Sequence, residues 1–304
     1  MNLGYACINT ALSTNKIMTN RTMRRKTFEA KGLEYVSDLS LLNVKDLKTI
    51  VQWNNEMGIK LFRLSSQIFP WTDDYKLSDL KDYDEMCELM IEIGEIATNA
   101  NQRLTMHPGP YNCLASPNQK VVEKTIRELN VHSEQFNMFG FEPSNYNKIN
   151  IHVGGAYGDK ESTLTRFCKN FELLRDDTKK RLVIENDDSP NEYSVKDLYE
   201  GIYKSIGIPI TFDYFHHKFN TGGLTEEEAL KLAATTWPDD VVQCCHYSES
   251  RRKEKLDESI RAQAHSDIIY DKIQTYGLEP DIVVEAKLKE QAVFNHWSLA
   301  RPMQ

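Results

Sequence analysis

Short apolar runs alternate with longer amphipathic segments along the whole chain. Each run has five or six residues, and most runs are nearly continuous in apolar and β-branched residues. Continuous runs of this kind are typical of parallel strands that are buried on both faces. We therefore predict eight strands, at residues 3–8, 60–65, 103–107, 148–153, 181–185, 209–213, 241–246 and 281–285.

A segment with helical spacing of apolar residues follows each predicted strand. The first has Leu47, Ile50 and Val51 on one face and Gly58 just past its end, where glycine is a common C-cap. The later helices are predicted over residues 83–97, 118–139, 162–174, 195–203, 225–233, 259–276 and 289–299.

Eight strand–helix units in 304 residues predict an α/β fold, a (β/α)₈ TIM barrel. The competing fold is a doubly wound sheet, but no glycine fingerprint follows any of the strands. The chain contains no linker, repeat or low-complexity stretch, so we predict a single domain over residues 1–304.

Composition narrows the class of protein further. The chain is 40% hydrophobic and 27% charged, as in globular proteins, and no apolar run approaches the ~20 residues of a membrane-spanning helix. The first residues do not resemble a secretory signal, and six cysteines without a CxxC pair suit a reducing compartment. We expect an intracellular monomer with no membrane partner.

The ends of the strands carry an unusual set of polar residues. A single histidine or acid there is more often a capping or surface residue. Six strands, however, end in side chains that bind metals, and in a barrel these ends form one rim where catalytic residues lie. The six residues are His107, His152, Glu185, Asp213, His246 and Glu285. We therefore predict a metal cluster at the C-terminal rim.

Two more histidines extend this set. His216 lies three residues beyond Asp213, and His265 follows the seventh strand. Eight ligands exceed the four of a tetrahedral centre, so two or three ions that share bridging carboxylates fit better. Imidazole with carboxylate suits Zn²⁺, Mn²⁺ or Fe²⁺. Such clusters lower the pKa of bound water to about 7 and hold both reacting oxygens of a phosphodiester. Glu185 and Glu285 are the expected bridging carboxylates.

Charge alone neither identifies nor excludes a nucleic-acid partner. With 37 basic and 45 acidic residues the net charge is −8, which excludes a wholly basic surface but not a local basic groove. Basic residues cluster at 21–26 and at Arg251, Arg252 and Lys253, and Lys287 follows the eighth strand. These segments follow strands one, seven and eight, so we expect them to contact phosphates at the rim, although solvated surface charge is the alternative.

Two tyrosines could take part in the same surface. Tyr5 and Tyr111 lie near the predicted rim, where their rings could stack on bases or wedge between them. For Tyr5 a role in the core is the alternative.

The sequence resembles a known family, the ultraviolet damage endonucleases. The similarity runs in co-linear order from about residue 3 to residue 290. It rests on the motifs GYACIN (4–9), FRLSS (62–66), HPGPY (107–111), HVGG (152–155), ENDD (185–188), FDYFHH (212–217), HYSES (246–250), AHSD (264–267) and VEAKLKE (284–290).

The resemblance implies a metal-dependent TIM-barrel DNA repair enzyme, related in fold to apurinic endonucleases. Such enzymes nick damaged double-stranded DNA immediately 5′ to cyclobutane pyrimidine dimers and 6-4 photoproducts, leaving 3′-hydroxyl and 5′-phosphate ends. It implies the same eight metal ligands, with Mn²⁺ favoured and Zn²⁺ or Mg²⁺ as alternatives. Glu185, Glu285 and His246 are the expected catalytic residues, and Asn9, Pro110 and Ser248 join the expected DNA contacts.

Two positions depart from the family pattern. After HPG the family generally has Gln and then an aromatic residue, whereas this chain has Pro110 and Tyr111. Proline offers no side-chain hydrogen bond to read base edges. The family also usually has Lys two residues before the seventh-strand histidine, where this chain has Cys244, which removes a cation and adds a softer potential ligand. These departures concern lesion preference and metal choice rather than the fold.

Three other functions remain open. A TIM-barrel apurinic endonuclease would use the same site on abasic DNA. A metal-dependent sugar isomerase would need a small closed pocket and no basic rim loops. A damage-binding protein with a degenerate site would suit Pro110 and Cys244, but all eight ligand positions are filled.

Overall fold

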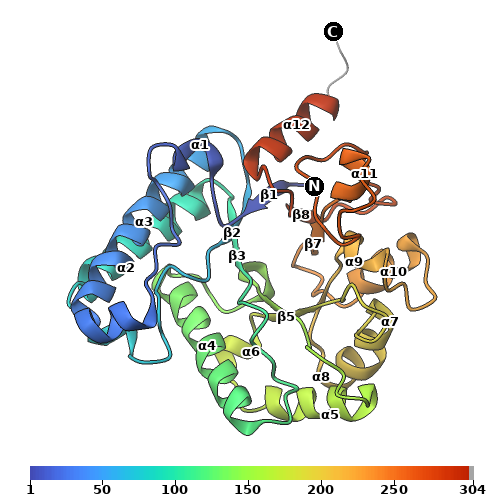
Figure 1. Ribbon diagram of the computed structural model, residues 1–304, viewed down its shortest axis with the longest axis horizontal. Coiled ribbons are helices and arrows are strands. Elements are labelled where there is room, and N and C mark those ends of the chain that lie inside the picture. The colour runs from blue at the N-terminus through green and yellow to red at the C-terminus, as the bar shows by residue number, and fades with distance from the viewer. Residues whose placement is uncertain (301–304) are drawn as a thin grey trace.

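Eight parallel strands form the centre of the molecule, and helices surround them (Figure 1). The computed structural model describes residues 1–300, with side chains through residue 298, so the last four residues of the predicted domain lie outside the described residues. The strands are β1 Leu3–Ala6, β2 Leu61–Leu64, β3 Arg103–Met106, β4 Ile149–Ile151, β5 Leu182–Glu185, β6 Ile210–Thr211, β7 Cys244–Tyr247 and β8 Asp281–Val284. All eight predicted strands are confirmed.

The sheet closes into the predicted barrel. Its hydrogen-bonded order is β6-β5-β4-β3-β2-β1-β8-β7, with every pairing parallel. The seam between β6 and β7 is joined by a parallel bridge between Asp213 and His246, where the His246 amide donates to the Phe212 carbonyl over 2.9 Å. Two predicted metal ligands therefore lie at the seam where the barrel closes.

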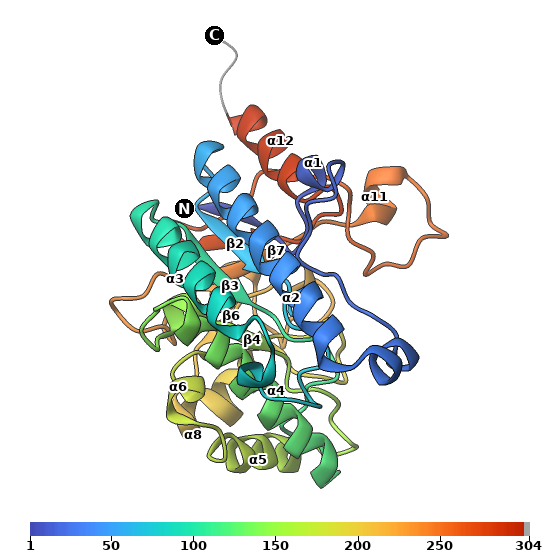
Figure 2. The same ribbon diagram turned by 90° about the vertical axis from the view of Figure 1, so that its left-hand side faces the viewer.

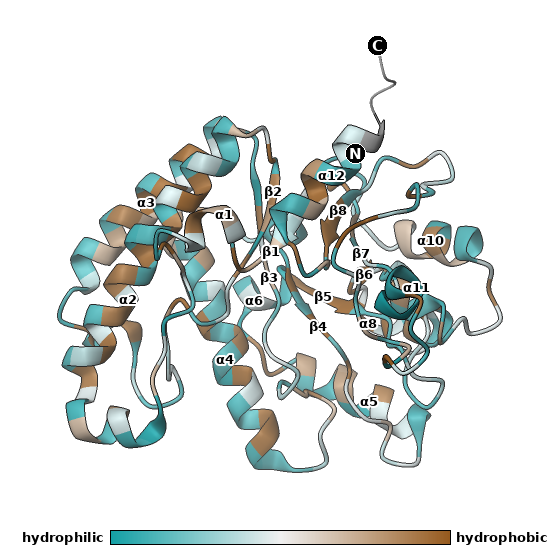
Figure 3. Ribbon diagram, turned by 45° about the horizontal axis from the view of Figure 1, so that its top comes forward, coloured by the Kyte–Doolittle hydropathy of each residue, from teal (hydrophilic) through white to brown (hydrophobic). Residues whose placement is uncertain are grey.

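Helices cover the outside of the barrel. They are α1 Thr10–Ser13, α2 Arg25–Glu56, α3 Tyr83–Asn99, α4 Gln119–Met138, α5 Lys160–Phe171, α6 Asp176–Lys179, α7 Val195–Leu198, α8 Lys204–Ile206, α9 Tyr214–His217, α10 Glu226–Ala234, α11 Arg251–Lys255 and α12 Glu290–Ala300. Two short 3-10 helices, η1 Leu77–Asp79 and η2 Asn145–Asn147, and one π-helical segment, η3 Tyr199–Tyr203, complete the set. Their apolar faces turn toward the strands, which is visible as brown stripes in Figure 3. Among the described helices none is long and apolar enough to cross a membrane.

One predicted helix is absent from the described residues. Residues 259–276 form an irregular segment, and only the short α11 precedes it. Carboxylates hold its backbone instead of helical hydrogen bonds. Glu249 accepts from the amides of Tyr270 and Asp271 at 2.8 and 3.0 Å, and Glu254 accepts from those of Asp267 and Ile268. The apolar spacing reflects single buried side chains, Ile269 and Ile273, in an irregular segment rather than one face of a helix.

The end of the barrel opposite the rim is closed by a buried ion pair. Arg103, only 1% exposed, lies 3.2 Å from the Asp281 carboxylate and donates to the Val242 and Tyr146 carbonyls over 2.7 and 2.6 Å. These contacts join β3 and β8 across the barrel. The predicted metal ligands lie at the other end of the barrel, where the strands end.

Gly4 allows β1 and β2 to approach closely. A Cβ atom at this position would lie 2.0 Å from the Leu61 carbonyl oxygen. Because that atom belongs to the backbone of the neighbouring strand, we expect Gly4→Ala to lower the unfolding free energy by about 1–3 kcal/mol or more. Urea unfolding measures this. Gly155→Ala, where a Cβ would meet no atom within 4 Å, is the matched control, and equal stability of the two variants would contradict the prediction.

Candidate metal centre and DNA interface

Glu185 lies at the centre of the rim. It ends β5, is 1% exposed and is surrounded by histidines from four other parts of the barrel. Two groups of ligand atoms share it, each with all atoms within 4.8 Å of one another: His107, Glu185 and His246, and His152, Glu185 and His216. Five of the eight predicted ligands therefore form two adjoining groups around one carboxylate.

The two oxygens of Glu185 face different histidines. Oε2 lies 3.1 Å from His107 Nε2 and 3.7 Å from His152 Nε2. Oε1 lies 3.1 Å from His246 Nδ1 and 3.5 Å from His216 Nδ1. A carboxylate in this position can bridge two cations.

The other three predicted ligands border these groups. Glu285 lies 3.4 Å from His246 Nδ1 and is paired with Arg63, whose guanidinium comes from β2. His265 Nδ1 donates to the Glu285 carbonyl over 2.9 Å. Asp213 accepts from the amides of Phe215 and His216 through Oδ1, whereas its buried Oδ2 has no hydrogen-bond partner among the described residues. An unpartnered buried acceptor beside histidines is a position that a cation would satisfy.

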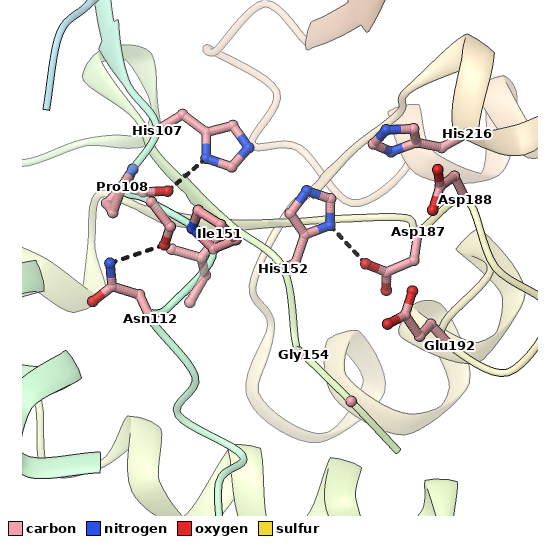
Figure 4. A pocket seen from close by; sticks show the side chains of 13 residues that line it. His107, Pro108, Asn112, Ile151, His152, Gly154, Asp187, Asp188, Glu192 and His216 are labelled. Atoms are coloured by element: carbon pink, nitrogen blue, oxygen red, sulfur yellow. Dashed lines mark hydrogen bonds and ion pairs between the residues drawn. The ribbon is translucent and has the colours of Figure 1, made fainter. Parts of the chain in front are cut away.

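Four of the histidines are oriented as metal ligands usually are. The Nδ1 atoms of His107, His216 and His265 donate to the carbonyls of Pro108, Asn186 and Glu285 at 2.8–3.0 Å, and Nδ1 of His152 lies 2.7 Å from Asp187 (Figure 4). A carbonyl can only accept, so in the three carbonyl-bonded rings Nδ1 carries a proton, which leaves Nε2 as the atom that a cation would bind. The donor set fits divalent metal ions.

Electrostatics support the same conclusion. Burial alone would raise the pKa of Glu185, but the surrounding rings of His246, His152 and His107 hold it well below its usual range. Burial lowers the pKa of His152, yet Glu185 and Asp187 outweigh burial and raise it to about 10. The site thus holds a negative carboxylate that draws positive charge inward, and a bound cation would displace these protons.

His246 is held differently from the other histidines. Its Nε2 lies 3.2 Å from the Lys148 ammonium, and burial lowers the pKa of His246 to about 3 against the opposing effect of Glu185. Lys148 is fully buried at the start of β4. Cys244 belongs to neither ligand group and packs in the barrel interior with Ala6 and Leu61. A lysine therefore does lie beside His246, but it comes from the start of β4 rather than from position 244 on β7, and burial lowers the pKa of its amine.

The rim opens into a cavity of about 350 Å³. His107, His152 and His216 lie along one side, and Asp187 and Glu192 lie along another (Figure 4). The loop after β3, which carries Pro110 and Tyr111, forms part of its wall. Pro110 is exposed, and Tyr111 is 86% exposed, so its ring is free to meet a ligand that approaches the rim.

Three expected DNA contacts are buried instead. Tyr5 is 0% exposed, and its hydroxyl donates to Asn54 over 2.8 Å and accepts from Asn9 over 2.9 Å. Asn9 is 1% exposed and caps α1 by accepting from the Leu12 amide. Ser248 is also 1% exposed. These side chains lie beneath the rim, and almost none of their surface is exposed for contact with DNA in this structure.

The basic run lies on α11, which projects from the rim (Figure 2) and is strongly hydrophilic (Figure 3). Arg251 lies 3.4 Å from Asp267, Arg252 lies 3.1 Å from Glu258, and Lys253 lies 3.1 Å from Asp271. Arg21 of the other basic run is paired with Asp46 at 2.6 Å. Lys287 is exposed on the loop after β8. Phosphates would have to compete with these acids for the paired cations.

Sequence reasoning missed four residues of the site, Arg63, Lys148, Asn150 and Asp187. Lys148 and Asn150 carry a usable signal. They stand four and two residues before His152, so on a strand with a two-residue period they point to the same side. Arg63 similarly stands out as a charge within an apolar strand.

Comparison with known proteins agrees with this geometry. The family model described as "UV-endonuclease UvdE" matches residues 1–301. A UV-damage endonuclease of Schizosaccharomyces pombe is 38% identical over 96% of this chain, which spans about half the length (49%) of that relative. A putative UV-damage endonuclease of Acanthamoeba polyphaga mimivirus is 33% identical over 96% of this chain and 88% of its own length.

Solved structures agree as well. The crystal structure of SacUVDE has a TM-score of 0.84 and 31% identity, and the alignment covers 99% of this chain and 100% of that one. A D-psicose 3-epimerase of Clostridium cellulolyticum has a TM-score of 0.56 at 11% identity, covering 94% of this chain and 85% of that one, which is a likeness of fold alone. From the family model, the relatives and the barrel together, the chain belongs to the UV-damage endonuclease family.

Proposed function

We propose that this chain is a metal-dependent DNA repair endonuclease that nicks the phosphodiester immediately 5′ to ultraviolet photoproducts. Its substrates would be double-stranded DNA with cyclobutane pyrimidine dimers or 6-4 photoproducts, and its products 3′-hydroxyl and 5′-phosphate ends. The observation that carries the proposal is the pair of ligand groups that share Glu185 at the rim of the barrel. Family membership supports the choice of substrate.

Two or three divalent ions would bind the eight side chains, with Mn²⁺ favoured over Zn²⁺ or Mg²⁺. Glu185 would bridge the two groups that contain His107 and His246 on one side and His152 and His216 on the other. When bound, such ions supply an activated water and stabilise charge on the phosphodiester oxygens. Asp213, His265 and Glu285 border these groups and would complete the ligand set.

The chain's own residues orient this chemistry. Arg63 pairs with Glu285 and so fixes that carboxylate beside His246. The carbonyls that accept from the histidine Nδ1 atoms hold the rings in place before a substrate arrives. Pre-organised ligands of this kind need no rearrangement when charge develops on the scissile phosphate.

DNA would approach the rim face between the protruding loops. Tyr111 is the exposed ring best placed to fill the gap that an extruded lesion leaves, with Pro110 setting its direction. Arg251, Arg252 and Lys253 of α11 and Lys287 after β8 would contact phosphates around the site.

A nicking assay tests the function as a whole. The substrate is a duplex with one defined dimer, and the protein is assayed with chelator and after Mn²⁺, Mg²⁺ or Zn²⁺ is restored. Nicking 5′ to the dimer that depends on the metal supports the proposal. Cleavage of an abasic duplex alone would favour an apurinic endonuclease, turnover of a ketose would favour an isomerase, and tight binding without cleavage would favour a damage-binding protein.

Glu185→Gln should abolish nicking while the protein stays folded. A neutral amide of the same shape cannot bridge two cations, so metal is lost or misplaced. The measurements are nicking rate, metal content and melting temperature. Glu192→Gln, which changes an acid of the cavity wall outside both ligand groups, is the control and should lose far less activity. Normal nicking by a folded Glu185→Gln variant would remove Glu185 from the mechanism.

Tyr111→Ala should weaken binding to damaged duplex by about 1–3 kcal/mol, the range for one base–aromatic stack. Undamaged DNA should be affected much less, because phosphate contacts dominate there. Equilibrium binding to matched damaged and undamaged duplexes measures the difference, and Tyr111→Phe, which keeps the ring, should bind like the original chain. Equal losses on both duplexes would mean that Tyr111 supports the loop rather than filling the gap.

Binding should be strongly salt-dependent despite the net charge of −8. Each phosphate contact contributes a slope of about −0.9 in log K against log salt. Replacing Arg251, Arg252 and Lys253 with Gln should therefore flatten the slope without removing metal. The control replaces Lys60, Lys179 and Lys180, which precede β2 and β5 at the opposite end of the barrel. An unchanged slope in the first variant would mean that the basic residues of α11 do not contact DNA phosphates.

A further inference from the structure

The interior of the barrel directly beneath the ligand groups is polar. Lys148 and Asn150 are both 0% exposed, and Thr211 on β6 is also fully buried. Barrel interiors are usually filled by branched apolar side chains, and buried polar groups are costly unless each finds a partner. These residues therefore need a structural or functional reason to be there.

A closed ring of contacts connects them to the ligands. The Lys148 amine donates to Thr211 Oγ1 over 2.8 Å and to Asn150 Oδ1 over 3.2 Å. The Asn150 amide in turn donates to Glu185 Oε2. The ring is completed through His246, which lies 3.2 Å from Lys148 and 3.1 Å from Glu185 Oε1.

The chemistry of lysine fixes which way the Asn150 amide points. A lysine amine offers hydrogen-bond donors to its neighbours, so the atom of Asn150 that faces Lys148 must be the acceptor, Oδ1. The NH₂ group then has to face Glu185, which accepts. Without Lys148 the amide could turn and present an oxygen to a carboxylate oxygen, which would be repulsive.

Asn150 in turn limits the rotation of Glu185. The carboxylate must keep Oε1 toward His246 and Oε2 toward His107 if it is to serve both ligand groups. The amide bonds to Oε2 only, from inside the barrel, and leaves the histidine side of the carboxylate open. A residue that hydrogen-bonds to a metal-binding carboxylate in this way typically contributes about 10–100-fold to metal affinity or activity.

We propose that Asn150 is a positioning residue that fixes Glu185 between the two ligand groups, and that Lys148 fixes the orientation of the Asn150 amide. The proposal rests on the proposed function only in treating the groups as a metal centre.

Mn²⁺ binding to the full chain tests the proposal without any DNA. Chelator-treated Asn150→Leu is titrated with Mn²⁺, and free and bound ions are distinguished by electron paramagnetic resonance. We expect metal affinity about 10–100-fold weaker than in the original chain and an altered spectrum of the bound ion. The matched control is Asn147→Leu, which removes a buried amide bonded to the Leu104 carbonyl away from the ligands, and it should bind Mn²⁺ normally.

Two further variants keep the test decisive. Asn150→Ala cannot overpack the barrel and replaces Asn150→Leu if the latter fails to fold, with the same expected loss. Lys148→Met should change affinity and spectrum in the same direction, because the Asn150 amide is then free to turn. Normal Mn²⁺ affinity and spectrum in the folded Asn150 variants would overturn the proposal, and normal values in Lys148→Met would remove Lys148 from it.

Kinetics separate this proposal from the proposed function. On a dimer-containing duplex, the Asn150 variants should lose about tenfold or more in kcat with little change in KM, because the exposed DNA-contacting loops are untouched. A loss confined to KM would count against a positioning role. If the original chain does not nick the duplex but Mn²⁺ binding still depends on Asn150, the proposed function fails while the positioning role stands.

Discussion

The buried carboxylate of Glu185 organises the rim of the barrel that holds the candidate metal centre. Glu185 is 1% exposed, and a carboxylate so far from water must be balanced by nearby positive charge. The imidazole of His152, whose pKa rises to about 10, provides that balance when no cation is bound. Metal ions could replace protons here because His107 and His152 already face Glu185 with Nε2, and their Nδ1 atoms are held by Pro108 and Asp187. Electrostatic demand and ligand geometry therefore point to the same occupant.

The candidate metal centre can form only when the barrel is closed. The ligands come from separate strands and meet only if the sheet curls fully, and the β6–β7 seam is bridged at Asp213 and His246 themselves. Cations bound by both residues would add metal–ligand bonds at the seam, where a single backbone bridge joins the strands. Metal binding at the proposed centre would therefore be coupled to the integrity of the barrel through the same two side chains.

Regular features of the fold could be predicted because they follow from periodicity. The eight strands are visible as apolar runs, and ligand-type residues at their ends are informative because parallel strands share a rim. Less regular features could not be predicted in this way. Tyr5 belongs to the GYACIN motif, but its hydroxyl bonds to Asn54 and Asn9, and sequence spacing does not reveal a hydrogen bond between residues that are 49 positions apart. Asn150 and Lys148 stand two and four residues before His152, so a prediction that considers only the ends of the strands does not include them.

The carboxylate-anchored segment after β7 has a consequence for how the rim can diverge among related proteins. A helix constrains every residue along its face, whereas residues 259–276 depend on a few fixed points, chiefly Glu249 and Glu254 binding backbone amides. Backbone amides are present whatever the side chain, so exposed residues of the segment such as Ser259, Lys272 and Gln274 can change in identity while the path of the chain is kept, whereas His265 and the buried Ile269 and Ile273 are constrained. The exposed part of the loop beside His265 can thus acquire new surface chemistry by drift, at little risk to the fold that carries the candidate metal ligands.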